Sequence, residues 1–245
     1  FYSTSFGGAY WLLMIILFSF VIQAVSYEFQ NKLGNILGAR TFQTFLIING
    51  VLGPVLLGGA VATFFNGSNF IVDKDNITTM AQPVISRWAN ASHGLDALLD
   101  LWNVVLGVAV FFLARVLCLL YIINNVAHAP VVTRARKQLR LCTVVFLAFF
   151  LSFLVHLLLK DGYAYDPQTG IISMQPLKYL HNLTTMWYLT IVLLVGVASL
   201  LYGIVRTLRD ANFNRGIWFG GVGVVLVVLV LLLCAGWNNT AYYPS

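Results

Sequence analysis

Two histidines are the residues best suited to hold a cofactor. His156 lies near the end of one long apolar stretch, and His181 lies just before another. Histidine is a common axial ligand of haem iron, so a pair on neighbouring helices could hold a b-type haem. His156 is, however, one helical turn from Lys160, and His181 borders a polar loop. Interfacial histidines are the plainer interpretation, and haem ligation is the alternative.

Charged residues in or beside apolar stretches indicate polar routes or subunit contacts. Arg115 is the one formally charged residue well inside such a stretch, and burying it costs at least ~2.5 kcal/mol. Its side chain either extends to the membrane surface or meets an acid supplied by another chain. Glu28 and Lys32, four residues apart, form either a surface ion pair or a proton-collecting group.

No pattern in the sequence predicts a catalytic or metal centre in this chain. We find no nucleophile–base arrangement, paired carboxylates or phosphate-binding loop, and the three cysteines have no zinc or disulfide spacing. Hydrophobic residues make up 60% of the 245 residues and charged residues only 9%, whereas soluble domains carry about 25% charged residues. The mean hydropathy is +0.85. This composition excludes a water-soluble enzyme and a nucleic-acid binder.

Six apolar runs are long enough to cross a bilayer, which takes about 20 residues in a helix. Because backbone groups in lipid must be satisfied internally, each run must be helical. The sequence therefore predicts an all-α, polytopic transmembrane helical bundle. We expect a single transmembrane domain over residues 1–245, with spans at about 6–27, 42–65, 101–123, 139–159, 183–208 and 217–237.

The basic residues predict the direction of these spans. Nine lie in the connections after the first, third and fifth spans, and four lie on the other side. Positive charge collects on the cytoplasmic side, so these three turns should face the cytoplasm. Tryptophans at the ends of the spans agree with interfacial anchoring: Trp11, Trp102, Trp187, Trp218 and Trp237.

The second span carries a stripe of small or ring-closed residues. Gly50, Pro54 and Gly58 recur every four positions, with Gly53 beside them. Helices in lipid associate through close backbone contact, so this face should pack on another helix, within this subunit or in another. Pro54 should kink the span.

The outer loops carry weaker signals. We expect a short amphipathic helix over residues 84–88 and a turn over residues 166–170. Five Asn-x-Ser/Thr triplets, the glycosylation pattern of eukaryotic chains, begin on this side, at Asn66, Asn76, Asn90, Asn182 and Asn238.

Several short motifs follow one another along the chain: Ser26–Lys32, Asn49–Val61, Asn66-Gly67, Leu101–Arg115, Asn124-Asn125 and Gly236–Ser245. Their order resembles subunit II of the cytochrome bd quinol oxidases, in the variant of Bacteroides-type bacteria. The resemblance covers essentially the whole chain and corresponds to spans two to seven of eight, so we expect a fragment lacking the first and last spans.

This resemblance implies a multi-pass subunit of a bacterial cytoplasmic (inner) membrane complex. The complex would oxidise ubiquinol or menaquinol and reduce dioxygen, taking protons from the cytoplasm. Haems b558, b595 and d would belong to the large subunit I. This chain would support assembly of that subunit and line proton access, with Glu28 and Arg115 as candidates, and some members hold a structural quinone.

Two other functions remain open from the sequence. A b-type cytochrome would use His156 and His181 as ligands. A multispan transporter would need broken helices and a polar site near mid-membrane, to which only Arg115 and the Pro54 kink point.

Overall fold

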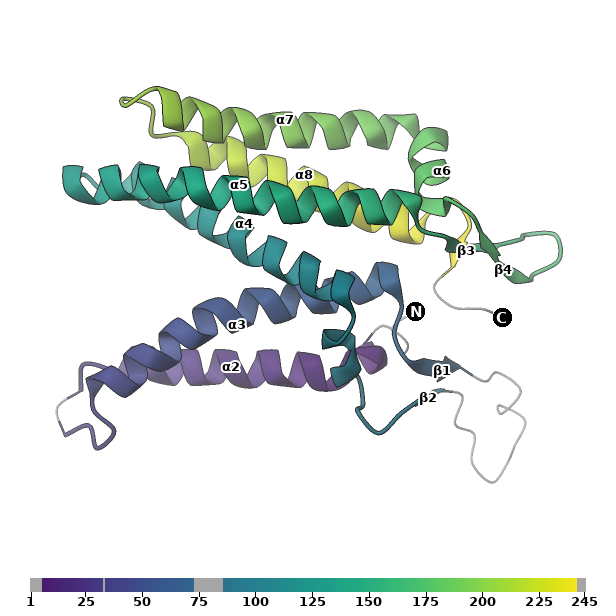
Figure 1. Cartoon of the computed structure of the whole chain (residues 1–245), viewed down its shortest axis with the longest axis horizontal. Helices are drawn as coiled ribbons and strands as arrows, with labels where there is room; N and C mark the ends of the chain where they lie inside the picture. Colours follow the sequence, from purple (N-terminus) through teal and green to yellow (C-terminus); the bar gives the residue numbers. More distant parts are fainter. Residues whose placement is uncertain (1–5, 33, 73–85, 242–245) are drawn as a thin grey trace. The chain divides into compact units, whose positions relative to one another are not determined.

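The computed structural model describes residues 6–32, 34–72 and 86–241. The chain forms two compact units, Phe1–Phe111 and Phe112–Ser245, and helix α4 (Leu101–Asn125) contributes to both. Figure 1 shows that helices dominate each unit. The expectation of a single transmembrane domain is not tested by this division and stays a prediction.

Six helices of the described residues are long and apolar enough to cross a membrane, as the six runs predict. Two of them, α2 and α3, belong to the first unit, and three, α5, α7 and α8, belong to the second. With α4, their bounds are Tyr10–Phe29, Ala39–Asn66, Leu101–Asn125, Ala129–Leu159, Trp187–Arg209 and Gly216–Gly236.

Helix α5 begins ten residues before its expected start at residue 139. A proline in its first turn suits a helix start, since its missing N–H would be unpaired there anyway. The stretch that follows is rich in Arg, Lys and Gln, which favour a helix but are too polar for the hydrocarbon core. Hydropathy detects only the apolar part of such a helix, which explains the difference.

The fifth span begins at Trp187, four residues later than expected, because the helix is broken at Met186. Residues Lys178–Thr185 form a separate short helix, α6, and Met186 has non-helical dihedrals of φ −95° and ψ 57°. The break frees the carbonyl of Leu183, which accepts a hydrogen bond from the Thr190 hydroxyl at 2.8 Å. The backbone group is therefore satisfied without a continuous helix.

In the first unit, α2 packs against α3, and the adjoining loop forms a small hairpin. The core between the helices consists of Ala9, Leu12, Ile16, Leu56 and Ala60. Strands β1 (Phe70–Val72) and β2 (Ser86–Trp88) pair antiparallel, and a 3-10 turn, η2 (Leu95–Leu98), precedes α4.

The amphipathic helix expected over residues 84–88 is wrong over its described part, since Ser86–Trp88 is a strand. Trp88 packs edge-on against Phe70 and at a tilt to His93, with ring centroids 6.3 and 4.5 Å away, and its Nε1 donates to the Gly7 carbonyl at 2.8 Å. These contacts come from segments distant in the sequence, and they favour a strand over a helix. Five residues are too few for hydrophobic periodicity to distinguish the two. Residues 84 and 85, like Lys74 and Asn76, lie outside the described residues.

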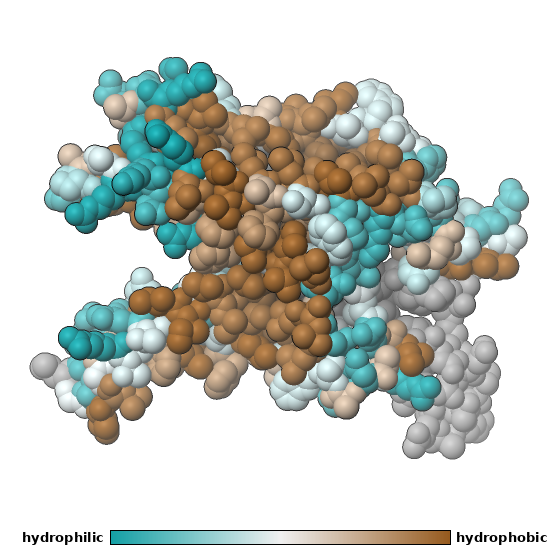
Figure 2. All heavy atoms as spheres, viewed as in Figure 1, coloured by the Kyte–Doolittle hydropathy of each residue, from teal (hydrophilic) through white to brown (hydrophobic). Residues whose placement is uncertain are grey.

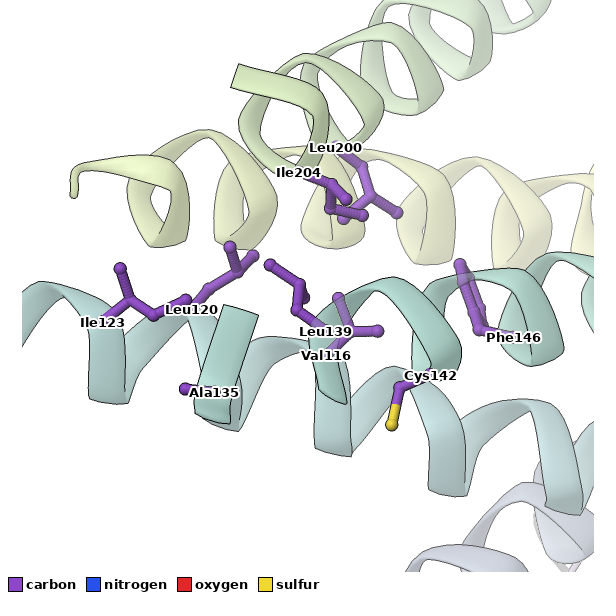
Figure 3. Packing of buried hydrophobic residues seen from close by; sticks show 9 residues of the cluster. All are labelled: Val116, Leu120, Ile123, Ala135, Leu139, Cys142, Phe146, Leu200 and Ile204. Carbon is purple, nitrogen blue, oxygen red and sulfur yellow. The ribbon is translucent and has the colours of Figure 1, made fainter. Parts of the chain in front are cut away.

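The second unit is built on helices α5, α7 and α8 with the second part of α4. Figure 3 shows its largest core cluster, which joins α4, α5 and α7: Val116, Leu120, Ile123, Ala135, Leu139, Cys142, Phe146, Leu200 and Ile204. Helices α7 and α8 run antiparallel with glycines facing backbone. A Cβ on Gly196 would lie 3.0 Å from the Gly223 carbonyl oxygen, so the two helices need glycine to approach this closely.

A three-stranded sheet closes one end of the second unit. Strand β3 (Gly162–Tyr165) pairs with β4 (Ile172–Gln175) and with β5 (Thr240–Ala241), both antiparallel. The expected turn over residues 166–170 connects β3 to β4, with Gly170 at φ +72°. The sheet therefore ties the segment after α8 to the segment after α5.

Candidate functional site

Glu28 and Lys32 form an ion pair at the end of α2, with Lys32 Nζ 2.9 Å from Glu28 Oε1. Both side chains are exposed, at 65% for Glu28 and 52% for Lys32. Lys32 also lies over the ring of Phe29, 4.7 Å from its centroid. The pair is thus a local surface contact between residues four apart. The Glu28 carboxylate remains accessible at this end of the helix.

Arg115 lies in the part of α4 that belongs to the second unit, and its side chain is exposed. The next residue, Val116, is fully buried in the core of that unit. Arg115 therefore points away from the core of its own unit. It lies ten residues from the end of α4 at Asn125, or about 15 Å along the helix, within the apolar part of the span.

The small residues of α3 divide into a packed half and an open half. Gly58 lies against the first part of α4, where an added Cβ would be 2.7 Å from the Gly107 Cα. Gly53 is buried, and an added Cβ there would be 3.3 Å from a ring carbon of Phe20 on α2. Gly50 is exposed with nothing within 4 Å. Pro54 is half-buried inside the continuous helix α3.

His156 and His181 both lie in the second unit, in the last turn of α5 and in α6. His181 is exposed, and its Nε2 is 3.4 Å from the Thr185 hydroxyl one turn along the same helix. As a haem ligand, His181 would have to turn this nitrogen toward the iron, and the pair stays a prediction. Within the described residues, no three His, Cys, Asp or Glu side chains gather where they could hold a metal ion.

A polar pair between α2 and α3, with Asn49 buried and Gln23 half-buried, was missed by sequence reasoning. Asn49, only 4% exposed, donates from Nδ2 to the Gln23 Oε1, and its own Oδ1 is buried without a partner in the part of the chain described. On α2, Ser19 and Ser26 are buried on the same side as Gln23, and each donates to a carbonyl of its own helix. Uncharged amides inside apolar runs are the signal that could have revealed these polar contacts.

A second polar cluster, also missed, joins α6 to the segment after α8. Asn182 is fully buried and donates from Nδ2 to the Cys234 carbonyl at 2.9 Å and to the Thr240 hydroxyl at 2.7 Å. Lys178 is 3% exposed and donates from Nζ to the Asn238 carbonyl at 2.8 Å. Burial lowers the pKa of Lys178 below its usual value, because the charged form loses water.

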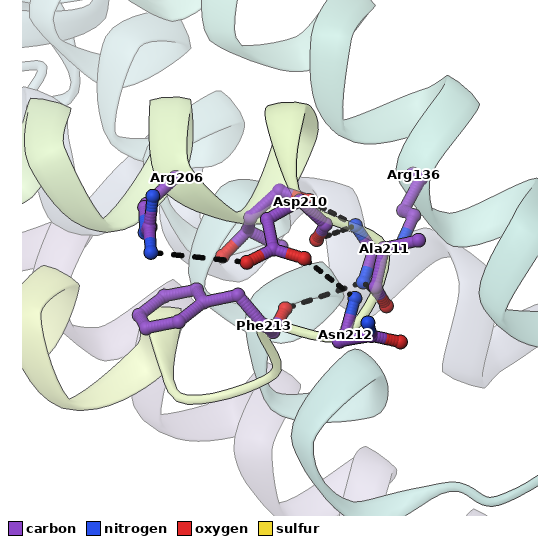
Figure 4. Close-up of polar contacts among 7 residues, drawn as sticks. Arg136, Arg206, Asp210, Ala211, Asn212 and Phe213 are labelled. Atoms are coloured by element: carbon purple, nitrogen blue, oxygen red, sulfur yellow. Dashed lines mark hydrogen bonds and ion pairs between the residues drawn. The ribbon is translucent and has the colours of Figure 1, made fainter.

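Arg136 makes an extensive polar contact within the second unit. From α5 its guanidinium donates to the carbonyls of Thr207, Asp210, Ala211 and Phe213, the last three at 2.9, 2.9 and 3.2 Å. These carbonyls end α7 or follow it, and helix ends leave such groups unpaired. Figure 4 shows the guanidinium of Arg136 pointing into this turn.

The opposite side of the same turn is held by Arg206. Its guanidinium lies 3.8 Å from the Asp210 carboxylate and 5.8 Å from Phe213, measured to the ring centroid. From the sequence, Arg136 and Arg206 contribute only to the prediction of span direction. No local pattern distinguishes Arg136 from the basic residues beside it.

Comparison with protein families gives one match over the whole chain. The model of the family described as cytochrome bd terminal oxidase subunit II matches residues 1–245. No curated protein matches the chain. The six apolar helices agree with a multi-pass membrane subunit of a respiratory oxidoreductase complex. The chain belongs to the cytochrome bd terminal oxidase subunit II family.

Proposed function

We propose that this chain is the haem-free partner of the haem-bearing subunit I in a bacterial inner-membrane quinol oxidase, and that it supports the assembly of that subunit. The observation that carries the proposal is the family match over residues 1–245. Haems b558, b595 and d on subunit I would supply the electron transfer from ubiquinol or menaquinol to dioxygen. The residues of this chain would hold the complex together and guide protons.

Arg115 is the proposed contact with subunit I. It is exposed in the apolar part of α4, where an arginine facing lipid is costly. An acidic or otherwise polar surface on a neighbouring subunit removes that cost. The face of α4 that bears Arg115 is therefore the face we assign to the interface.

The row of polar side chains between α2 and α3 supports a role in proton access. Ser19, Gln23 and Ser26 follow one another at helical spacing, and Asn49 faces them from α3. The buried Asn49 Oδ1 can accept a hydrogen bond from water. Glu28 lies two residues from Ser26 on the exposed side of α2, where its carboxylate would collect protons at the predicted cytoplasmic surface.

The test is to produce the full-length protein with and without subunit I and to record visible spectra of both preparations. We expect haem bands in the complex and none in stoichiometric amount in this subunit alone. A stoichiometric haem spectrum from this subunit alone, lost in His156→Ala or His181→Ala, would show a b-type cytochrome instead. Solute uptake by liposomes that contain only this subunit would favour a transporter.

The proton role needs a separate measurement. Glu28→Gln in the complex should slow oxygen consumption driven by quinol, whereas Lys32→Gln keeps the carboxylate and should have a smaller effect. Equal rates for wild type and Glu28→Gln would remove Glu28 from the proton route.

A further inference from the structure

One face of α5 is exposed along the whole helix and changes from basic to apolar. The basic part carries Lys137 and Arg140, both exposed. The apolar side chains below them recur at intervals of three, four or seven residues and are 51–65% exposed: Leu141, Val144, Leu151, Val155 and Leu159. The buried residues of α5, Ala135, Leu139, Cys142 and Phe146, lie on the opposite side of the helix by the helical repeat of 3.6 residues per turn. This exposed face is called the α5 outer face below.

The charge at the basic end is not neutralised by the chain itself. Four basic residues and no acid lie in residues 129–140. Arg136 is engaged by the backbone carbonyls of the α7–α8 turn, and the Asp210 carboxylate pairs with Arg206. Among the described residues, neither Lys137 nor Arg140 forms an ion pair. Two cations are therefore held at the edge of an apolar surface by a helix that Arg136 fixes in place.

Helix α5 is longer than the hydrocarbon core of a bilayer is thick, so its basic start can reach the lipid headgroups. Its 31 residues span about 46 Å, while the hydrocarbon core is only ~30 Å thick. Arg140 is followed directly by the apolar run, with Val144 exposed one turn further. Figure 2 shows the same change, from hydrophilic surface at the end of α5 and the α7–α8 turn to hydrophobic surface along the helices.

We propose that the α5 outer face binds one anionic phospholipid, with its phosphate between Lys137 and Arg140 and an acyl chain along Leu141, Val144 and Leu151. A soluble phosphate would use only the two charges, whereas a lipid uses the charges and the apolar stripe that continues them. A protein partner would need acidic residues at one end of an apolar helix. An anionic phospholipid carries the negative charge and the apolar chain in one molecule.

The test uses the full-length protein, extracted from its membrane with any subunits that accompany it. Phosphatidylglycerol that remains bound after detergent exchange is measured by mass spectrometry, and the protein is then offered vesicles of phosphatidylcholine with and without phosphatidylglycerol. Lys137→Gln or Arg140→Gln should lower bound phosphatidylglycerol about fivefold, and the double variant about 30-fold. Arg40→Gln removes the same charge at the start of α3 and should leave it unchanged.

Two further variants separate the lipid from other occupants. Val144→Asn keeps both charges but breaks the apolar stripe, so it should also lower retention of phosphatidylglycerol. Competition by inorganic phosphate should fail to displace the lipid. The proposal is overturned if the double variant retains phosphatidylglycerol as wild type does, if Arg40→Gln loses as much, or if inorganic phosphate displaces it fully. It is also overturned if a co-purified protein covers Lys137 and Arg140. None of these outcomes bears on the haem spectra that test the proposed function.

Discussion

The side chain of Asn238 donates a hydrogen bond from Nδ2 to the Asn182 Oδ1 at 3.0 Å, which joins the segment after α8 to α6. Both asparagines begin an Asn-x-Ser/Thr triplet. Their amide nitrogens are used inside the protein, since Asn182 donates to the Cys234 carbonyl and to Thr240. In this fold the two triplets therefore mark an internal contact and not a surface for sugar attachment.

Replacing Asn182 with leucine should destabilise the second unit. The change leaves the Asn238 amide and the Cys234 carbonyl without their partner, and each buried group left unpaired costs about 1–3 kcal/mol. The thermal midpoint of the purified protein, followed by tryptophan fluorescence, should fall. Asn212→Leu at an exposed position is the matched control, and an equal fall there would contradict the assigned role of Asn182.

Two glycines of α3 should respond in opposite ways to alanine. In Gly58→Ala the new methyl meets the Gly107 Cα at 2.7 Å, so α3 and α4 must separate, at a cost of about 1–3 kcal/mol. In Gly50→Ala the methyl meets nothing within 4 Å, and the helix gains about 0.5–1 kcal/mol. Denaturation in mild detergent measures both. A destabilised Gly50→Ala would instead show that another helix covers that position in the membrane.

Arg136→Lys should loosen the turn between α7 and α8, because one ammonium group cannot reproduce a guanidinium bonded to four carbonyls. We expect a loss of about 2–4 kcal/mol, since hydrogen bonds to charged groups contribute about 1.5–3 kcal/mol each and part of the site is open to water. Trypsin should cut at Arg209 or Arg215 faster than in wild type. Arg134→Lys, on the exposed side of α5, should leave the cutting rate unchanged.

The hairpin between β3 and β4 should open in acid. The backbone N–H of Gln168 and then the Thr169 hydroxyl donate to Asp166 and lower the pKa of its carboxyl. A folded-state pKa below the unfolded value of about 3.9 gives stability that is present above that value and is lost as the pH falls through the lowered pKa. Exchange of the Gly170 amide should therefore accelerate at that low pH, and Asp166→Asn should flatten this dependence. The same pH profile in wild type and Asp166→Asn would assign the opening to another group.

The six spans follow from the sequence because a bilayer imposes a length and an apolar composition that local residues reveal. The start of α5 and the break at Met186 do not follow from hydropathy, since both lie where helix and membrane boundaries differ. A rule that uses the proline in the first turn of α5 would have placed its start correctly.

The polar contacts were out of reach for a different reason. Arg136 differs from Arg134 and Arg140 only through carbonyls more than 70 residues away, and no local pattern encodes that pairing. Asn49 and Gln23 carry no formal charge and belong to no pattern typical of a site. Uncharged amides are also costly in hydrocarbon, so their presence in an apolar run predicts an interhelical hydrogen bond.

The reach of Arg136 along the chain sets an order of events during biosynthesis. Arg136 is synthesised 71 residues before Thr207, which carries the first of the carbonyls that the guanidinium binds. At 5–20 residues per second, the ribosome needs roughly 4–14 seconds to add those residues. Throughout that interval the basic start of α5 depends on water, lipid or an insertion factor for its contacts. A nascent chain arrested before Thr207 thus presents a surface that the finished protein no longer shows.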